Sequence, residues 1–411
     1  MIGFIKRLWR DRRGNALVIA GAAMPLVVGA AGLAVDTIQW TMWKRQLQRA
    51  ADSAAYAGVY AKIENHAGMT AEQAVEGDLE KHNTTGIELL SGYPQIAYPT
   101  AAGYSDAVKV TLAVQKRLGF SSLFLSDPPT IKVTGTAAVF EAYTYCVDAR
   151  ATTGPGIIIA GSTNVDLGCG AISNSTDGDD SVDVNGTGHT FIADPVAAVG
   201  GIDGTINGSP NLQPYALGTE DVYAGLSTAI PSETPCANFN HRSTTNADGS
   251  KKPGCYNSFN LRGATVNLSP GVYYLNNTDI SLTGHDRLVG TGVTIILTGS
   301  NPGSITMRGS SSMDLTAPTT GTYANMLLIQ APNALTGNNN IINGDNTTAL
   351  DGAIYFPVGD LTFTGSSVGA IQCAMIVGWT ITFTGDAEIQ NDTSSCDAAT
   401  QIKGRKVRLI A

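Results

Sequence analysis

The chain has 411 residues, of which 14% are charged and 47 are glycine, and its net charge is -9. This composition is typical of an ordered, turn-rich and weakly charged protein rather than a disordered one. Between Ala151 and Thr400 there are 6 Lys and Arg residues against 21 Asp and Glu residues. The body therefore lacks the cations that neutralise phosphates, which excludes nucleic acid as a partner.

The first element in chain order is an apolar helix. No charged residue occurs from Ala16 to Val35, and twenty helical residues span about 30 Å, the thickness of a bilayer's hydrocarbon core. Trp40 and Trp43 follow, where interfacial aromatic side chains are favoured. We predict a basic cytoplasmic segment at 1–15 and a retained transmembrane helix at 16–36. The alternative is a signal peptide cleaved among small residues near the end of this run. Five cations precede the helix: Lys6, Arg7, Arg10, Arg12 and Arg13.

The helical pattern continues from Asp36 to about Lys62, and two stripes of small residues follow helical spacing, one before Asp36 and one after it. Residues at i and i+4 share a face, and small side chains there let a second helix approach closely in lipid. We predict that the membrane stripe packs against partner helices. For the soluble stripe, docking on a partner and packing on the chain's own sheet both stay open. The membrane stripe is Gly21, Pro25 and Gly29, and the soluble stripe is Ala50, Ala54 and Gly58.

A small α+β unit is predicted next. The stretch 69–82 has helical character with Thr70 as its candidate N-cap. The stretches 106–118 and 130–145 alternate apolar and polar residues, as half-buried strands do. A long helix followed by a small sheet predicts a pilin-like α+β unit over residues 37–145.

After residue 145 the pattern changes to short apolar strands among dense Asn, Gly, Thr and Ser. DLTFTG (360–365) and TITFTG (380–385) recur twenty residues apart, each after another strand. Such recurrence predicts a parallel β-solenoid, here a right-handed parallel β-helix over 146–411, so that the chain is mainly β. A β-sandwich is the alternative, although few hairpin turns occur. The stretch at about 200–260 interrupts the rhythm and is predicted to be a loop insertion closed by its own disulfide.

All six cysteines lie after residue 145, and their even number predicts disulfides in an oxidising periplasm. Pairing each cysteine with its neighbour in the sequence would close loops of about twenty residues, although other pairings stay open. Zinc is disfavoured, because no C-x-x-C motif occurs and no histidine lies near a cysteine pair. The predicted disulfide residues are Cys146, Cys169, Cys236, Cys255, Cys373 and Cys396.

The apolar helix, the segment RQLQRAADSAAYAG (45–58) and the strands after it resemble the TadE/TadG-like proteins of bacterial Tad (tight adherence, Flp-type) pilus assembly. The later part resembles the β-helical C-terminal regions that some TadG-like members carry. The matching stretches there are CGAISNS (169–175), LSPGVYYL (268–275), GTGVTIILTG (290–299) and LTAPTTGTYANMLLIQ (315–330).

This resemblance implies a single-pass protein of the bacterial inner membrane, with its N-terminus in the cytoplasm and its body in the periplasm. Prepilins of this system are cut after a glycine that is followed at the fifth and sixth positions by Glu and Tyr. Here Ile19 and Ala20 occupy those positions after Gly14, which argues against such processing. TadG-like proteins often contain a von Willebrand type A domain, but no D-x-S-x-S motif occurs, so we predict none.

Catalytic and metal-binding patterns are weak. The acidic cluster Asp177, Asp179, Asp180 and Asp183, with His189 nearby, departs from the EF-hand spacing. We interpret it as a solvated corner between strands, and calcium binding there stays open. No Walker A, H-E-x-x-H or G-x-S-x-G motif occurs. We therefore predict no cofactor, no metal and no enzymatic activity.

The sequence thus favours a membrane-anchored, non-enzymatic structural or assembly subunit of a Tad-type pilus or related secretion apparatus. Its expected partners are the lipid bilayer and other Tad pilus or secretion proteins, which it would contact through the N-terminal helix. The second hypothesis is a surface adhesin, functioning in cell adhesion, whose solenoid faces bind a glycan. The third is a polysaccharide lyase or hydrolase, because parallel β-helices also build such enzymes.

Overall fold

The structure, a computed structural model, describes residues 12–64, 68–82, 88–186, 188–232, 234–240, 246–343, 348–364, 370–372, 375–392 and 401–410. The chain divides into two compact units, Met1–Phe140 with Lys406–Ala411, and Glu141–Arg405. The C-terminal residues thus return to the first unit. Two strands, β3 and β30, contribute residues to both units.

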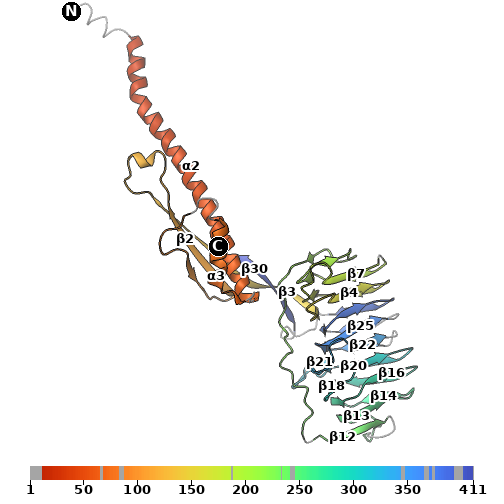
Figure 1. Ribbon diagram of the computed structural model, residues 1–411. Helices are drawn as coiled ribbons and strands as arrows, with labels where there is room; N and C mark the ends of the chain where they lie inside the picture. Colours follow the sequence, from red (N-terminus) through yellow and green to blue (C-terminus); the bar gives the residue numbers. More distant parts are fainter. Residues whose placement is uncertain are drawn as a thin grey trace, which may run out of the picture. The chain divides into compact units, whose positions relative to one another are not determined.

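The first unit is the α+β unit that the pattern of its segments predicts. Strands β1 and β2 pair antiparallel, β2 and β3 pair antiparallel, and β30 pairs with β3. The two helices and this sheet are visible in Figure 1. The elements are α2 (Arg12–Glu64), α3 (Ala71–His82), the 3-10 turn η3 (Ser121–Leu123), β1 (Gln95–Ala97), β2 (Ser105–Gln115), β3 (Thr130–Ala149) and β30 (Ile402–Leu409).

Local chemistry accounts for the start of α3 and for its packing. Thr70 Oγ1 accepts a hydrogen bond from the backbone N–H of Gln73, and Gln73 Oε1 accepts one from the N–H of Thr70. This reciprocal pair is a capping box, which satisfies two backbone donors at the helix start. Val75 of α3 and Val108 of β2 are both fully buried, so the core of this unit lies between the helices and the sheet.

The second unit is a parallel β-solenoid of about nine turns. Every strand pair between its described strands is parallel. The solenoid prediction is therefore confirmed and the β-sandwich alternative is wrong, since a sandwich of this kind is built from antiparallel pairs.

Three sheets line this solenoid. The first has the order β11-β9-β6-β3-β27-β24-β21-β18-β15-β13-β12, the second β10-β7-β4-β28-β25-β22-β19-β16, and the third β14-β17-β20-β23-β26-β29-β5-β8. The bounds not yet stated are β4 (Ile157–Ala160), β5 (Asn164–Asp166), β6 (Gly170–Ser173), β7 (Val182–Asn185), β8 (Thr190–Ile192), β9 (Val196–Ala198), β10 (Ile202–Asp203), β11 (Leu212–Gln213), β12 (Cys236–Asn240), β13 (Gly254–Asn260), β14 (Thr265–Leu268), β15 (Gly271–Asn276), β16 (Ile280–Leu282), β17 (Arg287–Thr291), β18 (Val293–Thr298), β19 (Ile305–Met307), β20 (Ser312–Thr316), β21 (Met326–Gln330), β22 (Asn338–Asn343), β23 (Ala349–Asp351), β24 (Ala353–Phe356), β25 (Gly359–Thr364), β26 (Ala370–Gln372), β27 (Ile376–Gly378), β28 (Ile381–Phe383) and β29 (Glu388–Asp392).

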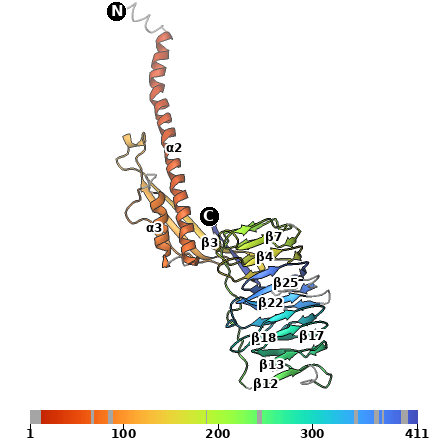
Figure 2. The ribbon, with the colours of Figure 1, turned by 45° about the vertical axis from the view of Figure 1, so that its right-hand side comes forward.

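The chain does not wind through the solenoid from one end to the other. It enters at β3, in the middle of the first sheet, and winds through β6 and β9 to one end. It then resumes at β12, at the opposite end, and winds back until β27 pairs with β3. Figure 2 shows the consequence, because the blue C-terminal turns lie between two groups of green turns. The two windings therefore close on each other at the centre.

Register in the solenoid follows from the apolar repeat. Phe363 in DLTFTG pairs with Phe383 in TITFTG, which are the two phrases that recur in the sequence. Phe383 in turn pairs with Ile159, across the junction of the two windings. Residues in register stack their side chains along the axis, and all three are fully buried. This stacking is why a twenty-residue recurrence indicates a solenoid.

The segment at about 200–260, expected to be an insertion closed by its own disulfide, contributes strands to the solenoid at both of its ends. Strands β10 and β11 terminate one winding, and β12 and β13 begin the other. Between them run residues 214–232, which we call the strap. Its Asp221 carboxylate accepts a hydrogen bond from Tyr355 OH at 2.8 Å, and Thr228 O accepts one from Thr298 Oγ1 at 2.6 Å. The strap therefore lies along the solenoid, because it must connect β11 to β12 at opposite ends of the first sheet.

Candidate functional site

Most of the large apolar side chains in the N-terminal half of α2 are exposed. The side chain of Leu26 is 76% exposed and that of Val35 is 51% exposed. The helix has a mean hydropathy of 1.7 in its most apolar window and is long enough to cross a membrane. Among the described residues, α2 is the one helix that is both long enough and apolar enough to cross a membrane. The other exposed apolar residues in this half are Ile19, Met24, Val27, Val28 and Leu33.

The membrane stripe lies on this exposed half. A Cβ atom added to Gly21 or to Gly29 would meet nothing within 4 Å. Pro25 stands between them, inside the helix. Within the described residues, this stripe is thus open to a partner or to lipid.

The soluble stripe is placed differently. Ala50 and Ala54 are fully buried, and a Cβ atom on Gly58 would come within 2.9 Å of Val108 Cγ1 and 3.0 Å of Val75 Cγ2. These residues therefore let α2 approach β2 and α3 of the same unit. Of the two interpretations left open by the spacing, packing on the chain's own sheet describes these contacts.

Tryptophan and lysine side chains follow the apolar half of α2. Lys44 Nζ lies 5.4 Å from the ring centre of Trp40, and Lys116 Nζ lies 4.6 Å from that of Trp43. A cation over an indole face is an attractive contact. Aromatic rings beside cations are typical of the boundary between a bilayer and water, which is the position that the sequence predicts for both tryptophans.

Two of the cysteine pairs lie at disulfide distance. The Cα atoms of Cys146 and Cys169 are 5.9 Å apart, and those of Cys236 and Cys255 are 4.3 Å apart. Both pairs join neighbours in the sequence, and each connects adjacent strands or turns of the solenoid. The remaining predicted disulfide residues, Cys373 and Cys396, lie outside the described residues.

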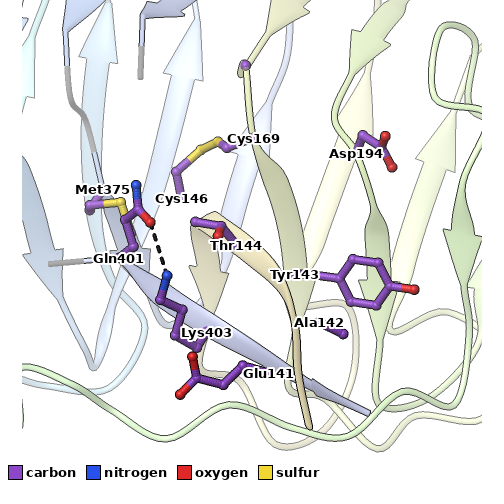
Figure 3. Close-up of a pocket in the computed structure, with 11 residues that line it drawn as sticks. Glu141, Ala142, Tyr143, Thr144, Cys146, Cys169, Asp194, Met375, Gln401 and Lys403 are labelled. Carbon is purple, nitrogen blue, oxygen red and sulfur yellow. Dashed lines mark hydrogen bonds between the residues drawn. A yellow bond between two sulfur atoms is a disulfide. The ribbon is translucent and has the colours of Figure 1, made fainter. Parts of the chain in front are cut away.

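A cleft of about 560 Å³ lies beside the first of these pairs. Figure 3 shows Lys403 directed toward Gln401, and Lys403 Nζ donates a hydrogen bond to Gln401 Oε1 at 3.2 Å. The carboxyl groups of Glu141 and Asp194 complete its charged lining. Such groups can hydrogen-bond to a polar ligand. The other lining residues are Ala142, Tyr143, Thr144, Cys146, Gly168, Cys169 and Met375.

Asp177, Asp179 and Asp180 of the acidic cluster lie in the connection between β6 and β7, and Asp183 lies in β7. The Asp177 carboxylate accepts a hydrogen bond from the backbone N–H of Asp179 at 3.3 Å, and a hydrogen bond with Asp177 raises the pKa of Asp180. His189 is buried, and its Nε2 lies 3.1 Å from the carbonyl oxygen of Thr205. Among the described residues, no group of three or more His, Cys, Asp or Glu side chains is arranged to hold a metal ion.

A buried polar network in the solenoid has no counterpart in the sequence analysis. Asp148 is 1% exposed, and its carboxylate accepts hydrogen bonds from Asn174 Nδ2 at 2.5 Å and from Thr219 Oγ1 at 3.1 Å. Arg150 Nη1 lies 3.2 Å from the same carboxylate. Thr219 belongs to the strap and is 71 residues away from Asp148 in the chain. No local motif signals such a contact, because it depends on where the strap passes along the solenoid.

Asp148 should make the stability of the solenoid depend on pH. Burial raises the pKa of this carboxyl to about 6, although Arg150 opposes the shift. Since the folded state then binds the proton more tightly than the unfolded state, this contribution is complete below the ordinary pKa of 3.8 and is lost as the pH rises through about 6. In the unsubstituted chain, we expect this carboxyl to lower the free energy of unfolding by about 3 kcal/mol as the pH rises across this window. In the Asp148→Asn variant, which has no group to titrate there, we expect that decrease to be absent.

Urea unfolding at several pH values, followed by tryptophan fluorescence, to which Trp379 contributes from the solenoid, measures this difference between the two proteins. Other carboxyl groups titrate in both proteins, so only the difference between the curves reports on Asp148. Parallel curves for the unsubstituted chain and the variant would contradict the assignment.

These features define a class: a protein with a candidate single-pass membrane anchor, an α+β unit and a parallel β-solenoid body. Residues 14–61 match the family model described as "Putative Flp pilus-assembly TadE/G-like". The chain therefore carries a Tad-like domain, and the match covers both the exposed apolar half of α2 and its buried half as far as Ala61. No curated protein and no solved structure matches the chain significantly.

Proposed function

We propose that this protein is a membrane-anchored, non-enzymatic structural or assembly subunit of a Tad-type pilus or related secretion apparatus. One observation carries the proposal: the TadE/G-like match at residues 14–61 coincides with the helix that exposes its apolar side chains. An exposed apolar helix is unfavourable in water but stable in lipid, where its backbone groups are already hydrogen-bonded.

In this proposal α2 crosses the bacterial inner membrane once. The cations that precede the apolar run stay in the cytoplasm, in line with the excess of Lys and Arg on that side of membrane proteins. The α+β unit and the solenoid stand in the periplasm. The two cysteine pairs at disulfide distance support this side, because disulfides persist in oxidising compartments.

Partner binding is assigned to the membrane stripe. Gly21 and Gly29 have open space where a side chain would lie, so a helix of another Tad protein can approach the α2 backbone closely there. The strands at the two ends of the solenoid, among them β11 and β12, have unpaired edges in the described chain. Such edges can bind a further strand by main-chain hydrogen bonds.

Leucine at both glycines tests the docking role. We expect the Gly21→Leu, Gly29→Leu variant to reduce co-purification of partner proteins from detergent-solubilised membranes by about tenfold, because the added side chains separate the helices. The matched control is Ala23→Leu, Ala30→Leu, which adds leucines on the opposite face of α2. Quantitative mass spectrometry of the purified material measures the effect.

Equal partner recovery from the two variants would contradict docking through the stripe. Cleavage of the solenoid by protease added to intact cells would favour the adhesin instead, since a periplasmic body is protected by the outer membrane.

A further inference from the structure

The connection between β2 and β3 lies beside α2, toward the N-terminal end of that helix (Figure 1). We call residues 116–129 the β2–β3 loop. Its Phe120 ring occupies the space over Gly32, where any side chain on residue 32 would overlap the ring. Gly32 belongs to the uncharged run that ends at Val35. The loop is therefore attached to α2 where the candidate membrane-spanning run ends.

A single carboxylate holds the loop in this place. Asp36 is 3% exposed and accepts hydrogen bonds from the backbone N–H of Phe120 at 2.9 Å and of Ser121 at 2.5 Å. The hydroxyl of Ser121 also donates to it. A carboxylate next to a bilayer is costly unless its oxygens are hydrogen-bonded. The loop satisfies Asp36, and Asp36 fixes the loop on the helix.

The tip of the loop carries three consecutive large apolar side chains that are exposed. Leu123 and Phe124 are each 74% exposed, and Leu125 is 54% exposed. The ring of Phe124 packs 5.3 Å from that of Phe120, which covers Gly32 of α2. The loop tip therefore adjoins the exposed apolar surface of α2, on which Leu33 is 57% exposed. The cation Lys116, at the start of the loop, lies over the Trp43 ring on the polar side of this surface.

We infer that the β2–β3 loop is a second membrane-contact element, which inserts Leu123, Phe124 and Leu125 into the leaflet that faces the α+β unit. The inference rests on the proposed membrane anchoring by α2. Lipid is favoured over a protein partner because the apolar side chains are continuous with the surface that α2 itself presents to the bilayer. Apolar side chains at such a position reach about 5–10 Å into the boundary between headgroups and acyl chains.

Quenching by lipid-attached nitroxides tests this insertion in the full chain, reconstituted in phosphatidylcholine and phosphatidylglycerol vesicles. An environment-sensitive fluorophore is attached at Leu123→Cys, and at Ala101→Cys as the matched control. Ala101 is exposed in the same unit but precedes β2, whereas the loop follows it, so the two sites lie at opposite ends of that strand. A third label at Val28→Cys reports on α2, and the unsubstituted chain gives the background from native cysteines.

We expect blue-shifted emission and strong quenching at Leu123 and Val28, and solvent-like emission without quenching at Ala101. Quenching at Val28 alone would overturn the loop inference while leaving the anchor intact. Loss of quenching at both sites would overturn the anchor and, with it, the loop inference. A Leu123 probe that is solvent-like in vesicles but shielded in native membranes would mean that a protein covers the loop, which also overturns the inference.

Replacing the carboxylate tests its positioning role. In the Asp36→Ala chain we expect loss of lipid quenching at Leu123, because Phe120 and Ser121 lose their acceptor. Quenching at Val28 should stay unchanged, since α2 remains in the membrane. Undiminished quenching at Leu123 would show that Asp36 does not hold the loop and would overturn that part of the inference.

Discussion

Replacing Gly135 by valine is expected to destabilise the α+β unit by about 3 kcal/mol or more, because the new side chain has no space. A Cβ atom at residue 135 of β3 would lie 2.6 Å from the backbone carbon and oxygen of Ala51 and 2.7 Å from the N atom of Asp52. These are backbone atoms of α2, which cannot rotate away as a flexible side chain would. Relief therefore requires the helix to move off the sheet.

The matched control is Gly77→Ala in α3, where a Cβ atom would meet nothing within 4 Å. Alanine there should stabilise the unit by up to about 1 kcal/mol, because alanine is the better helix former. Hydrogen exchange of the α2 and β3 amides in detergent-solubilised protein measures both effects. If Gly135→Val exchanged as slowly as the unsubstituted chain, the close contact between α2 and β3 would be refuted.

Replacing Phe383 by alanine is expected to destabilise the solenoid by about 3–5 kcal/mol, the range for removing a buried aromatic side chain. Phe383 is fully buried, and its ring centre lies 5.4 Å from that of Phe191 and 5.5 Å from that of Phe363. Phe383 also pairs with Ile159 at the junction of the two windings. The cavity would therefore open where the chain's first and last turns meet.

Thr382→Ala is the matched control for this cavity. Thr382 is the neighbour of Phe383 on β28, but its side chain is half-buried and points to the other face of the strand. Its loss should change the free energy of unfolding by no more than about 0.5 kcal/mol. Denaturant unfolding followed by tryptophan fluorescence, to which Trp379 contributes from the solenoid, compares the two variants. Equal stability of Phe383→Ala and Thr382→Ala would exclude the aromatic stack as a source of stability.

Much of the architecture was accessible from local pattern. The alternation in residues 106–118 and 130–145 corresponds to β2 and β3, with ends that differ by a few residues. The sequence predicts Thr70 as an N-cap, and Thr70 forms a capping box with Gln73. These predictions succeed because alternation and capping depend on residues within one or two turns of each other.

Contacts between distant residues were not accessible in this way. The hydrogen bonds from the backbone of Phe120 and Ser121 to Asp36 join positions 84 and 85 residues apart. The sequence shows Asp36 only as the end of an apolar run. Whether the Asp36 carboxylate faces water, lipid or a backbone donor depends on the position of the β2–β3 loop. The spacing of residues in the sequence does not predict that position.

By itself, the sequence determined the apolar anchor, the α+β elements and the repeating strands of the solenoid, because each follows from hydrophobic spacing within a short window. Only the tertiary structure decided that the chain enters the solenoid in its middle, that the expected insertion at about 200–260 supplies strands at both ends, and that Ala50, Ala54 and Gly58 face their own sheet. The physical reason is that solenoid turns with similar apolar strands could stack in many orders. The packing of side chains that are distant in the sequence selects one of these orders.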